Sequence, residues 1–194
     1  MTAASYFIAI DDTDNLESRG TGFRARELGR QLVQQGLAVV QGITRHQLFV
    51  SPLIPYTSHN SAACLAVRTS ATVETLRGSC GEFLLETSAS GSDAGLCIAA
   101  ATRVSEAVRT FGRRAKHEVL TQSEARTLAA REGICLAGYT GTQGGVIGAL
   151  AAAGLRAGDA DGEPRFGMLA TVREYAQEQL QASGDADAVH AALA

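Results

Sequence analysis

The sequence is short of positive charge in one specific way: Lys116 is the only lysine among 17 lysine and arginine side chains. The formal net charge is −3 and the isoelectric point is about 5.8. Proteins that bind nucleic acid unaided present a basic surface, and this composition provides no overall basic field. Unless Lys116 lies in the site, any phosphate chemistry must therefore depend on arginine, on backbone N–H groups or on a metal ion.

Long apolar runs and closely paired cysteines are also missing. No run approaches the ~20 apolar residues that a membrane span needs, and residues 1–5 are too short and uncharged for a signal peptide. The cysteines have apolar neighbours and no C-x-x-C spacing, which argues against a zinc site and predicts buried free thiols. These cysteines are Cys64, Cys80, Cys97 and Cys135. The expected compartment is the cytoplasm.

The glycine-rich stretch from Gly138 to Gly148 lacks both familiar nucleotide-binding signatures. It holds five glycines in eleven residues, but no Lys-Ser/Thr follows them, as a Walker A loop requires. The glycine spacing also departs from the dinucleotide-binding fingerprint. Two interpretations stay open: the glycines present backbone N–H groups to phosphate, or they let the alanine-rich segment that follows pack closely as a helix.

Three aspartates follow the first predicted strand, and the rest of the chain is organised around them. Phe7–Ile10 is an apolar run typical of a buried strand, and Asp11, Asp12 and Asp14 come directly after it. Like charges placed so closely cost free energy unless a cation or hydrogen bonds compensate. The simpler interpretation is that they form turns and cap a helix. Three together favour a magnesium site, because hard oxygen ligands suit Mg²⁺ and this ion bridges to substrate phosphates.

A turn-rich segment joins these acids to a predicted helix over 23–35. In open α/β proteins, ligands bind between a strand end and a helix start, and the helix N-terminus attracts phosphate. We therefore expect Gly20–Gly22 to supply N–H groups to a phosphate. Arg19 or Arg24 is expected to neutralise charge that develops there.

The remaining pattern alternates strands and helices. Strands are expected over 37–43, 62–68 and 134–136, and helices over 73–87, 96–111 and 124–132, with Ser123 as the cap of the last. His46–Val50 is a separate apolar stretch. Residues 89–94 form a predicted loop and the expected break between two subdomains. The basic residues 112–117 predict a solvated loop or, alternatively, a phosphate or RNA contact.

Three motifs in order resemble the archaeal tRNA-isoleucine agmatinylcytidine synthetases (TiaS). That family carries an IDDTDS segment, a prolyl segment of the form LNPxIPYKTRGN and a late GLIGALAAIG-like segment. The matching residues here are Ile10–Asp14, Ser51–Tyr56 with His59 and Asn60, and Gly144–Gly154. The resemblance extends over residues 7–154, about three quarters of the chain.

The resemblance implies an α/β (α+β) fold with a kinase-like ATP-binding core and a ferredoxin-like subdomain. This core is expected over 1–170, with a C-terminal helix and a frayed tail over 171–194. ATP and Mg²⁺ are the implied cofactors, with Asp11, Asp12 and Asp14 as metal ligands and one of them as a base. His59 and Asn60 are expected substrate contacts, unless they form only an exposed turn. The expected nucleotide-binding residues are Arg19, Gly20, Thr21, Gly22, Arg24, Gly141, Gly144, Gly145 and Gly148.

Departures from the family argue against its tRNA substrate. The family segment GMCTTY is replaced by Gly20-Thr21-Gly22-Phe23-Arg24, and KTRGN by residues 57–61, so the paired threonines and both basic residues are lost. Nothing after Ala170 is expected to form the OB-fold and zinc ribbon that grip tRNA in the family. We therefore expect an ATP- and Mg²⁺-dependent phosphotransferase or ligase that acts on a small-molecule or partner-delivered substrate and does not bind tRNA tightly alone. A partner chain or a homo-oligomer remains open.

Two other functions compete with this interpretation. An apolar strand followed by Asp12-Thr13-Asp14 resembles the haloacid-dehalogenase phosphatases, and Asp159 with Asp161 imitates their late acidic motif. Against this, Leu16 stands where that family has threonine or valine, and no apolar strand precedes Asp159. The third possibility is a non-catalytic module that binds ATP without consuming it.

Overall fold

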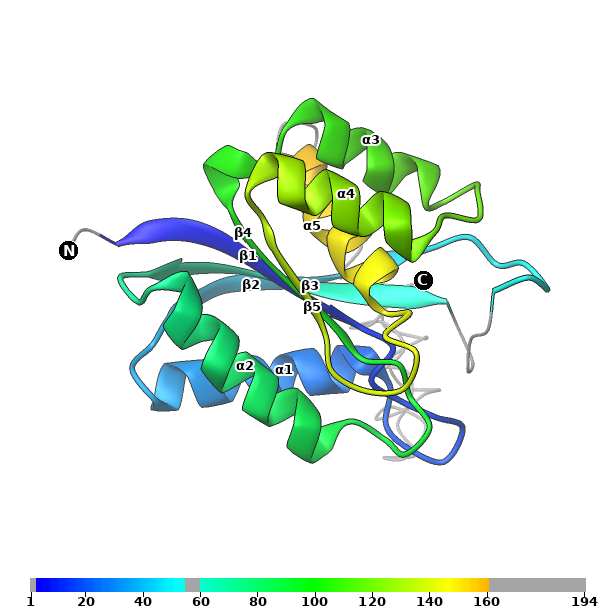
Figure 1. The fold of residues 1–194 in the computed structure, drawn as a ribbon. Coiled ribbons are helices and arrows are strands. Elements are labelled where there is room, and N and C mark those ends of the chain that lie inside the picture. Colours follow the sequence, from blue (N-terminus) through cyan, green and yellow to red (C-terminus); the bar gives the residue numbers. More distant parts are fainter. Residues whose placement is uncertain (1–2, 55–59, 161–194) are drawn as a thin grey trace, which may run out of the picture. The chain divides into compact units, whose positions relative to one another are not determined.

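The computed structural model describes residues 3–54 and 60–160, which form a five-stranded sheet flanked by helices (Figure 1). The strand order is β2-β3-β1-β4-β5, and each neighbouring pair is antiparallel. The strands are β1 (Ala4–Asp11), β2 (Val39–Gln47), β3 (Ser61–Thr69), β4 (Gly95–Ala100) and β5 (Cys135–Gly138). The helices are α1 (Thr21–Gln34), α2 (Val73–Thr87), α3 (Glu106–Arg114), α4 (Gln122–Glu132) and α5 (Val146–Ala160).

The first half of the fold has the order β-α-β-β-α-β that defines a ferredoxin-like split βαβ arrangement. β1 lies at its centre and pairs with β3 on one side and β4 on the other. The later residues add β5 at the edge of the sheet. They also add α3, α4 and α5, which cover the face of the sheet opposite to α1 and α2 (Figure 1). The mixed α/β fold expected from the sequence is confirmed. Residues 89–94 connect α2 to β4 within this one compact unit.

Alternate residues of β1 belong to two different cores. Ile8 and Ile10 are fully buried in the core that α1 and α2 form on one face of the sheet (Figure 1). Ala9 belongs to the core on the other face, which α3, α4 and α5 cover. Because a central strand covered on both faces buries every side chain, an uninterrupted apolar run is what this position requires.

The alanines of α5 allow it to lie close to the sheet. The strand residues of its core are small, including Ala9, Cys64 and Cys97. The helix itself is buried on all sides from Ala149 to Gly154, as expected for a helix that is apolar all round. The four cysteines are free, as predicted, and three of them are buried; Cys135 is only half-buried, contrary to the prediction.

The predicted helix over 96–111 is wrong. Its first part is the strand β4, which a 3-10 turn over Ala101–Arg103 joins to α3. Every residue from Gly95 to Ala99 is buried, and an apolar run of this kind does not distinguish a buried strand from a helix. The solvated loop predicted from residue 112 is also wrong in its first part, because α3 continues to Arg114.

Smaller corrections concern the ends of other elements. β2 continues to Gln47, so His46 belongs to it and not to a separate stretch. The cap of α4 is Thr121 rather than Ser123, because the Thr121 side chain accepts the Glu124 N–H in a capping box. The helix over 73–87 is confirmed with the predicted bounds despite its two glycines.

Two further expectations concern the C-terminal tail and membrane-spanning helices. The predicted helix and tail over 171–194 lie outside them. Within them, none of the helices has the length and apolar character that crossing a membrane requires.

Candidate functional site

A cavity of about 310 Å³ opens at the end of β1. Five structural segments line it: the end of β1 with the acids that follow, the described parts of the connection between β2 and β3, the loop before β4, the connector between α3 and α4, and the glycine-rich segment with the first turn of α5. Among the residues described, its lining contains no lysine or arginine. Its carboxylates are Asp11, Asp12, Asp14, Asp93 and Glu118. The cavity is therefore strongly acidic.

Asp11 is the last residue of β1 and lies against the first turn of α5. A Cβ atom added at Gly148 would overlap the Asp11 Oδ2 atom, so the carboxyl group rests on the helix backbone. Burial and then the charge of Asp12 raise the pKa of Asp11 to about 8, and Asp14 adds to this, whereas a hydrogen bond from the Asp12 backbone opposes it. A carboxyl group with this shift keeps its proton at neutral pH unless a cation compensates its charge.

Asp12 occupies the turn where β1 ends. Its φ angle is 52°, in the left-handed region that aspartate tolerates better than most residues. Burial raises the pKa of Asp12 to about 6, the Asp93 charge and then the Asp14 charge add to this, and a hydrogen bond from the Asp93 backbone opposes it. Asp12 therefore shares one electrostatic cluster with an acid from a distant part of the chain.

Asp14 is tied to the start of α1. The Thr21 hydroxyl donates to Asp14 Oδ1 at 2.9 Å and accepts from the Thr13 hydroxyl at 3.1 Å. A Cβ atom on Gly20 would lie 3.7 Å from Asp14 Oδ2. The structure therefore brings Gly20 and Thr21 beside the acids, as predicted, although the Thr21 hydroxyl group donates to Asp14.

The two predicted arginines do not line the cavity. Arg19 is exposed and places its guanidinium group 4.4 Å from the centre of the Phe23 ring. Arg24 forms an ion pair with Glu27, with 3.3 Å between Nη1 and Oε2. Their contact with a phosphate stays a prediction.

The glycine-rich segment meets the acids at the start of α5. Gly144, Gly145 and Gly148 line the cavity, whereas Gly141 lies behind it against Asp93. A Cβ atom on Gly145 would lie 2.6 Å from the Asp11 carbonyl oxygen. The close-packing interpretation of these glycines is confirmed by their contacts with β1. Three of them also face the acidic cavity, but their binding of phosphate stays a prediction.

Asp93 is the acid that the sequence alone did not indicate. It stands in the polar loop before β4, where one aspartate beside Gly91 gives no local signal beyond a turn. Its carboxylate accepts hydrogen bonds from Thr142 of the glycine-rich segment. Folding therefore adds a fourth aspartate to the predicted group of three.

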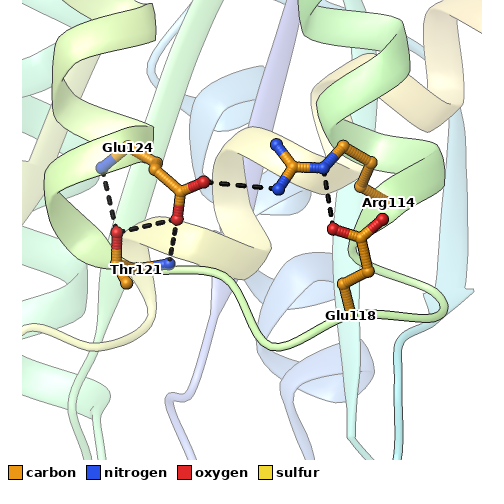
Figure 2. Close-up of polar contacts among 4 residues, drawn as sticks. All are labelled: Arg114, Glu118, Thr121 and Glu124. Atoms are coloured by element: carbon orange, nitrogen blue, oxygen red, sulfur yellow. Dashed lines mark hydrogen bonds and ion pairs between the residues drawn. The ribbon is translucent and has the colours of Figure 1, made fainter.

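The connector between α3 and α4 forms a second acidic wall of the cavity. Arg114 holds it by contacting Glu118 (Nε to Oε2, 2.9 Å) and Glu124 (Nη2 to Oε1, 3.3 Å), as Figure 2 shows. Glu124 also closes the capping box with Thr121 (Figure 2). The neighbouring Arg113 contacts Glu106 at 2.5 Å. Both arginines of the predicted basic cluster are therefore already paired with carboxylates.

Of the two predicted substrate contacts, only Asn60 belongs to the described residues. Asn60 lines the cavity, and its side chain donates to the Phe49 carbonyl oxygen at 2.6 Å. His59 lies outside the described residues. The late acidic motif of the phosphatase alternative is not formed as that family would require, because Asp159 lies within α5, and Asp161 is not among the described residues.

The carboxylates fit a magnesium ion whose remaining ligands come from water and a substrate phosphate. Among the described residues, no three His, Cys, Asp or Glu side chains are arranged to hold a metal by themselves. Magnesium usually takes only one or two carboxylates and completes its shell with water and substrate phosphate. Burial and the charges of neighbouring acids raise the pKa values of Asp11 and Asp12, and a cation bound beside them would counter both effects.

The raised pKa of the half-buried Asp11 predicts how stability depends on pH in EDTA. The pKa of Asp11 rises from 3.8 to about 8 on folding, so the folded state binds the proton more strongly. Its contribution to the free energy of unfolding is intact below about pH 4 and is lost as the pH rises towards 8. The free energy of unfolding of Asp11→Asn should therefore equal that of the wild type near pH 4 and exceed it near pH 8. Urea unfolding across this range tests it, and parallel curves for the two proteins would contradict it.

No family model matches the chain. An uncharacterised protein of Methanocaldococcus jannaschii is 28% identical over 152 residues, which are 76% of this chain and 49% of that protein. This chain thus spans about half of its curated relative.

Solved structures show the same fold. A complex of TiaS with its tRNA and ATP has a TM-score of 0.68 at 24% identity and covers 78% of this chain. Apo TiaS, a tRNA agmatidine synthetase, has a TM-score of 0.66 at 24% identity over 77% of this chain, and a tRNA fluorescent labeling enzyme has 0.65 at 25% over 77%. This chain covers only 35–36% of those proteins. The TiaS-like fold predicted from the three motifs is confirmed.

Proposed function

We propose that this chain is the core of an ATP- and Mg²⁺-dependent ligase or phosphotransferase. One observation carries the proposal: the acids after β1 and the glycines at the start of α5 converge on a single cavity. Carboxylates supply ligands for a hard cation, and glycine backbone N–H groups at a helix start supply donors for phosphate oxygens. The likeness to TiaS, of which an ATP complex is known, supports a nucleotide in this place.

Each group has a distinct task in this proposal. Asp11 and Asp12 hold the magnesium ion, which when bound neutralises charge on the phosphate oxygens during transfer. The backbone at Gly144 and Gly148, which line the cavity, orients the phosphate chain, whereas the Gly145 N–H is bonded to the Asp93 carbonyl oxygen. Asp14 acts through Thr21, because their hydrogen bond fixes the first residue of α1 beside the acids.

The acceptor that suits the cavity is a small cationic molecule. The aspartates give the cavity its negative charge, because Glu118 on the connector is already paired with Arg114. One solved TiaS structure is a complex with tRNA, AMPCPP and agmatine, so a protein of this fold binds an amine as well as a nucleotide analogue. Tight binding of tRNA by this chain alone is not proposed, since its net charge is −3 and Arg113 and Arg114 are paired with carboxylates.

Binding of Mg-ATP is the experiment that tests the proposal. A ligand present at about a hundred times its Kd stabilises the folded state by about 2.7 kcal/mol, which a thermal melt detects. Asp12→Asn should weaken Mg-ATP binding by about tenfold or more. The same variant should leave the apo protein as stable or more stable, because charge repulsion is relieved and asparagine accepts a positive φ angle.

Glu86→Gln is the matched control, because it removes one exposed acid of α2 outside the cavity. It should leave the affinity for Mg-ATP unchanged. A wild-type melting curve that Mg-ATP does not move would contradict the proposal, as would equal affinities for Asp12→Asn and the control. Saturable binding without formation of ADP, AMP or phosphate in the presence of candidate amines would favour the non-catalytic module.

A further inference from the structure

Asp93 lies between the acids after β1 and the glycine-rich segment, and it belongs to neither of these two motifs. Its carboxylate accepts both the backbone N–H of Thr142 and the Thr142 hydroxyl, the latter at 2.8 Å. Its carbonyl oxygen accepts the N–H of Gly145 at 2.9 Å. One residue therefore holds the glycine-rich segment at two points, on either side of Gly144.

The glycine-rich segment is shaped to receive this carboxylate. Gly141 has a φ angle of +47°, and a Cβ atom there would overlap Asp93 Oδ1. At Gly144 a Cβ atom would lie 3.7 Å from Asp93 Oδ2. A side chain at Gly141 would thus displace the carboxylate, so this glycine is needed for the contact and not only for the turn.

Neighbouring residues reinforce the same junction. The Thr140 hydroxyl donates to the Ser92 carbonyl oxygen at 2.7 Å and accepts the Ala94 N–H at 2.8 Å. The Tyr139 N–H bonds the Ala94 carbonyl oxygen at 2.9 Å. The loop before β4 and the glycine-rich segment are therefore joined along their length, with Asp93 at the end nearest α5.

Asp93 also faces the acids after β1. Its backbone N–H bonds the Asp12 carboxylate, and its charge acts on the same group. A phosphate chain bound between Asp12 and Gly144 would lie next to the loop before β4 and next to the glycine-rich segment. The orientation of the glycine N–H groups relative to Asp12 then depends on the contact between Asp93 and Thr142.

We propose that Asp93 is a positioning residue that fixes the glycine-rich segment in its phosphate-binding orientation through Thr142. This role rests on the proposed function, because it assumes that the segment binds phosphate. It assigns Asp93 no contact with the nucleotide and no place among the magnesium ligands.

A double-mutant cycle on Asp93 and Thr142 tests the role, with Mg-ATP affinity measured by calorimetry at saturating Mg²⁺. Asp93→Ala should weaken binding by about ten- to a hundredfold, and Thr142→Val by about three- to tenfold. In the Asp93→Ala background, Thr142→Val should add less than about a twofold loss, because the contact is already broken. Asp93→Asn should keep part of the affinity, since its amide oxygen still accepts the Thr142 N–H.

The Mg²⁺ concentration needed for half-maximal ATP binding separates positioning from metal ligation. It should be the same in the wild type and in Thr142→Val, which breaks the contact but keeps the Asp93 charge beside Asp12. A higher Mg²⁺ concentration for Thr142→Val would overturn the proposal. If Asp93 ligates the metal, Asp93→Asn binds as weakly as Asp93→Ala and Thr142→Val has no effect on affinity; either result would also overturn it. Amide hydrogen exchange over residues 139–145 in the apo protein should accelerate in Asp93→Ala, and unchanged exchange would also overturn it.

Failure of this role is distinguishable from failure of the proposed function. A wild-type protein that does not bind Mg-ATP would overturn the proposed function and this role with it. A wild-type protein that binds Mg-ATP, together with an Asp93→Ala variant of equal affinity, would overturn only the role of Asp93.

Discussion

Gly148→Ala is expected to weaken Mg-ATP binding by about ten- to a hundredfold, the range seen when the groups that orient a metal ligand are lost. The new Cβ atom would overlap Asp11 Oδ2 and come within 3.1 Å of Leu48 Cδ1. Leu48 is buried, so it has little room to move. The carboxyl group of Asp11 must therefore leave its place on the first turn of α5, and the proposed magnesium site would lose one of its ligands.

Gly158→Ala is the matched control for this variant, because Gly158 lies on the same helix and a Cβ atom there meets nothing within 4 Å. It should bind Mg-ATP as the wild type does. Calorimetry well below the melting temperature of each protein keeps loss of fold out of the comparison. Wild-type affinity in Gly148→Ala would show that the position of the Asp11 carboxyl group is not used in binding.

Residues close together in the sequence were the predictable part of this site. The apolar run Phe7–Ile10 and the acids after it give a strand end with clustered charge, and the structure has both. The meeting of these acids with Gly144–Gly148 was anticipated because the two motifs resemble those of one family in the same order. No local pattern joins residues so far apart, since their contact is made by the packing of α5 on the sheet.

Asp93 and Glu118 could not be predicted, because each is a single acid in a polar connection. Their proximity to the cavity depends on where the loop before β4 and the connector after α3 return to the sheet. The error over 96–111 has a related cause. β4 is buried between two helical layers, so its sequence lacks the alternation that marks a half-exposed strand.

Gly154→Ala is expected to lower the free energy of unfolding by about 3 kcal/mol, at the upper end of what overpacking costs. A Cβ atom on Gly154 would overlap the carbonyl oxygen of Val108 in α3 and lie 3.3 Å from the Arg109 Cα atom. These are backbone atoms, so no change of rotamer relieves the overlap. The two helices must separate, which exposes Val108 and Phe111, both buried in the wild type.

Urea unfolding of Gly154→Ala and Gly158→Ala measures this cost one helical turn apart on α5. The second variant should be more stable than the wild type by about 0.5–1 kcal/mol, because alanine loses less backbone entropy than glycine in a helix. Equal stability of the two variants would show that α3 and α5 do not depend on their close backbone approach.

Gly112→Ala provides the reciprocal change from α3. Its Cβ atom would lie 2.7 Å from the Ala151 carbonyl oxygen and 3.0 Å from the Leu155 backbone nitrogen. Once one substitution has moved α3 and α5 apart, the Cβ atom of the second substitution fits into the space between them. The double variant should therefore lose less stability than the sum of the two single losses, as is usual for neighbouring sites that share one displacement. Additive losses would mean that the two glycines relieve separate contacts and that α3 does not move as one body away from α5.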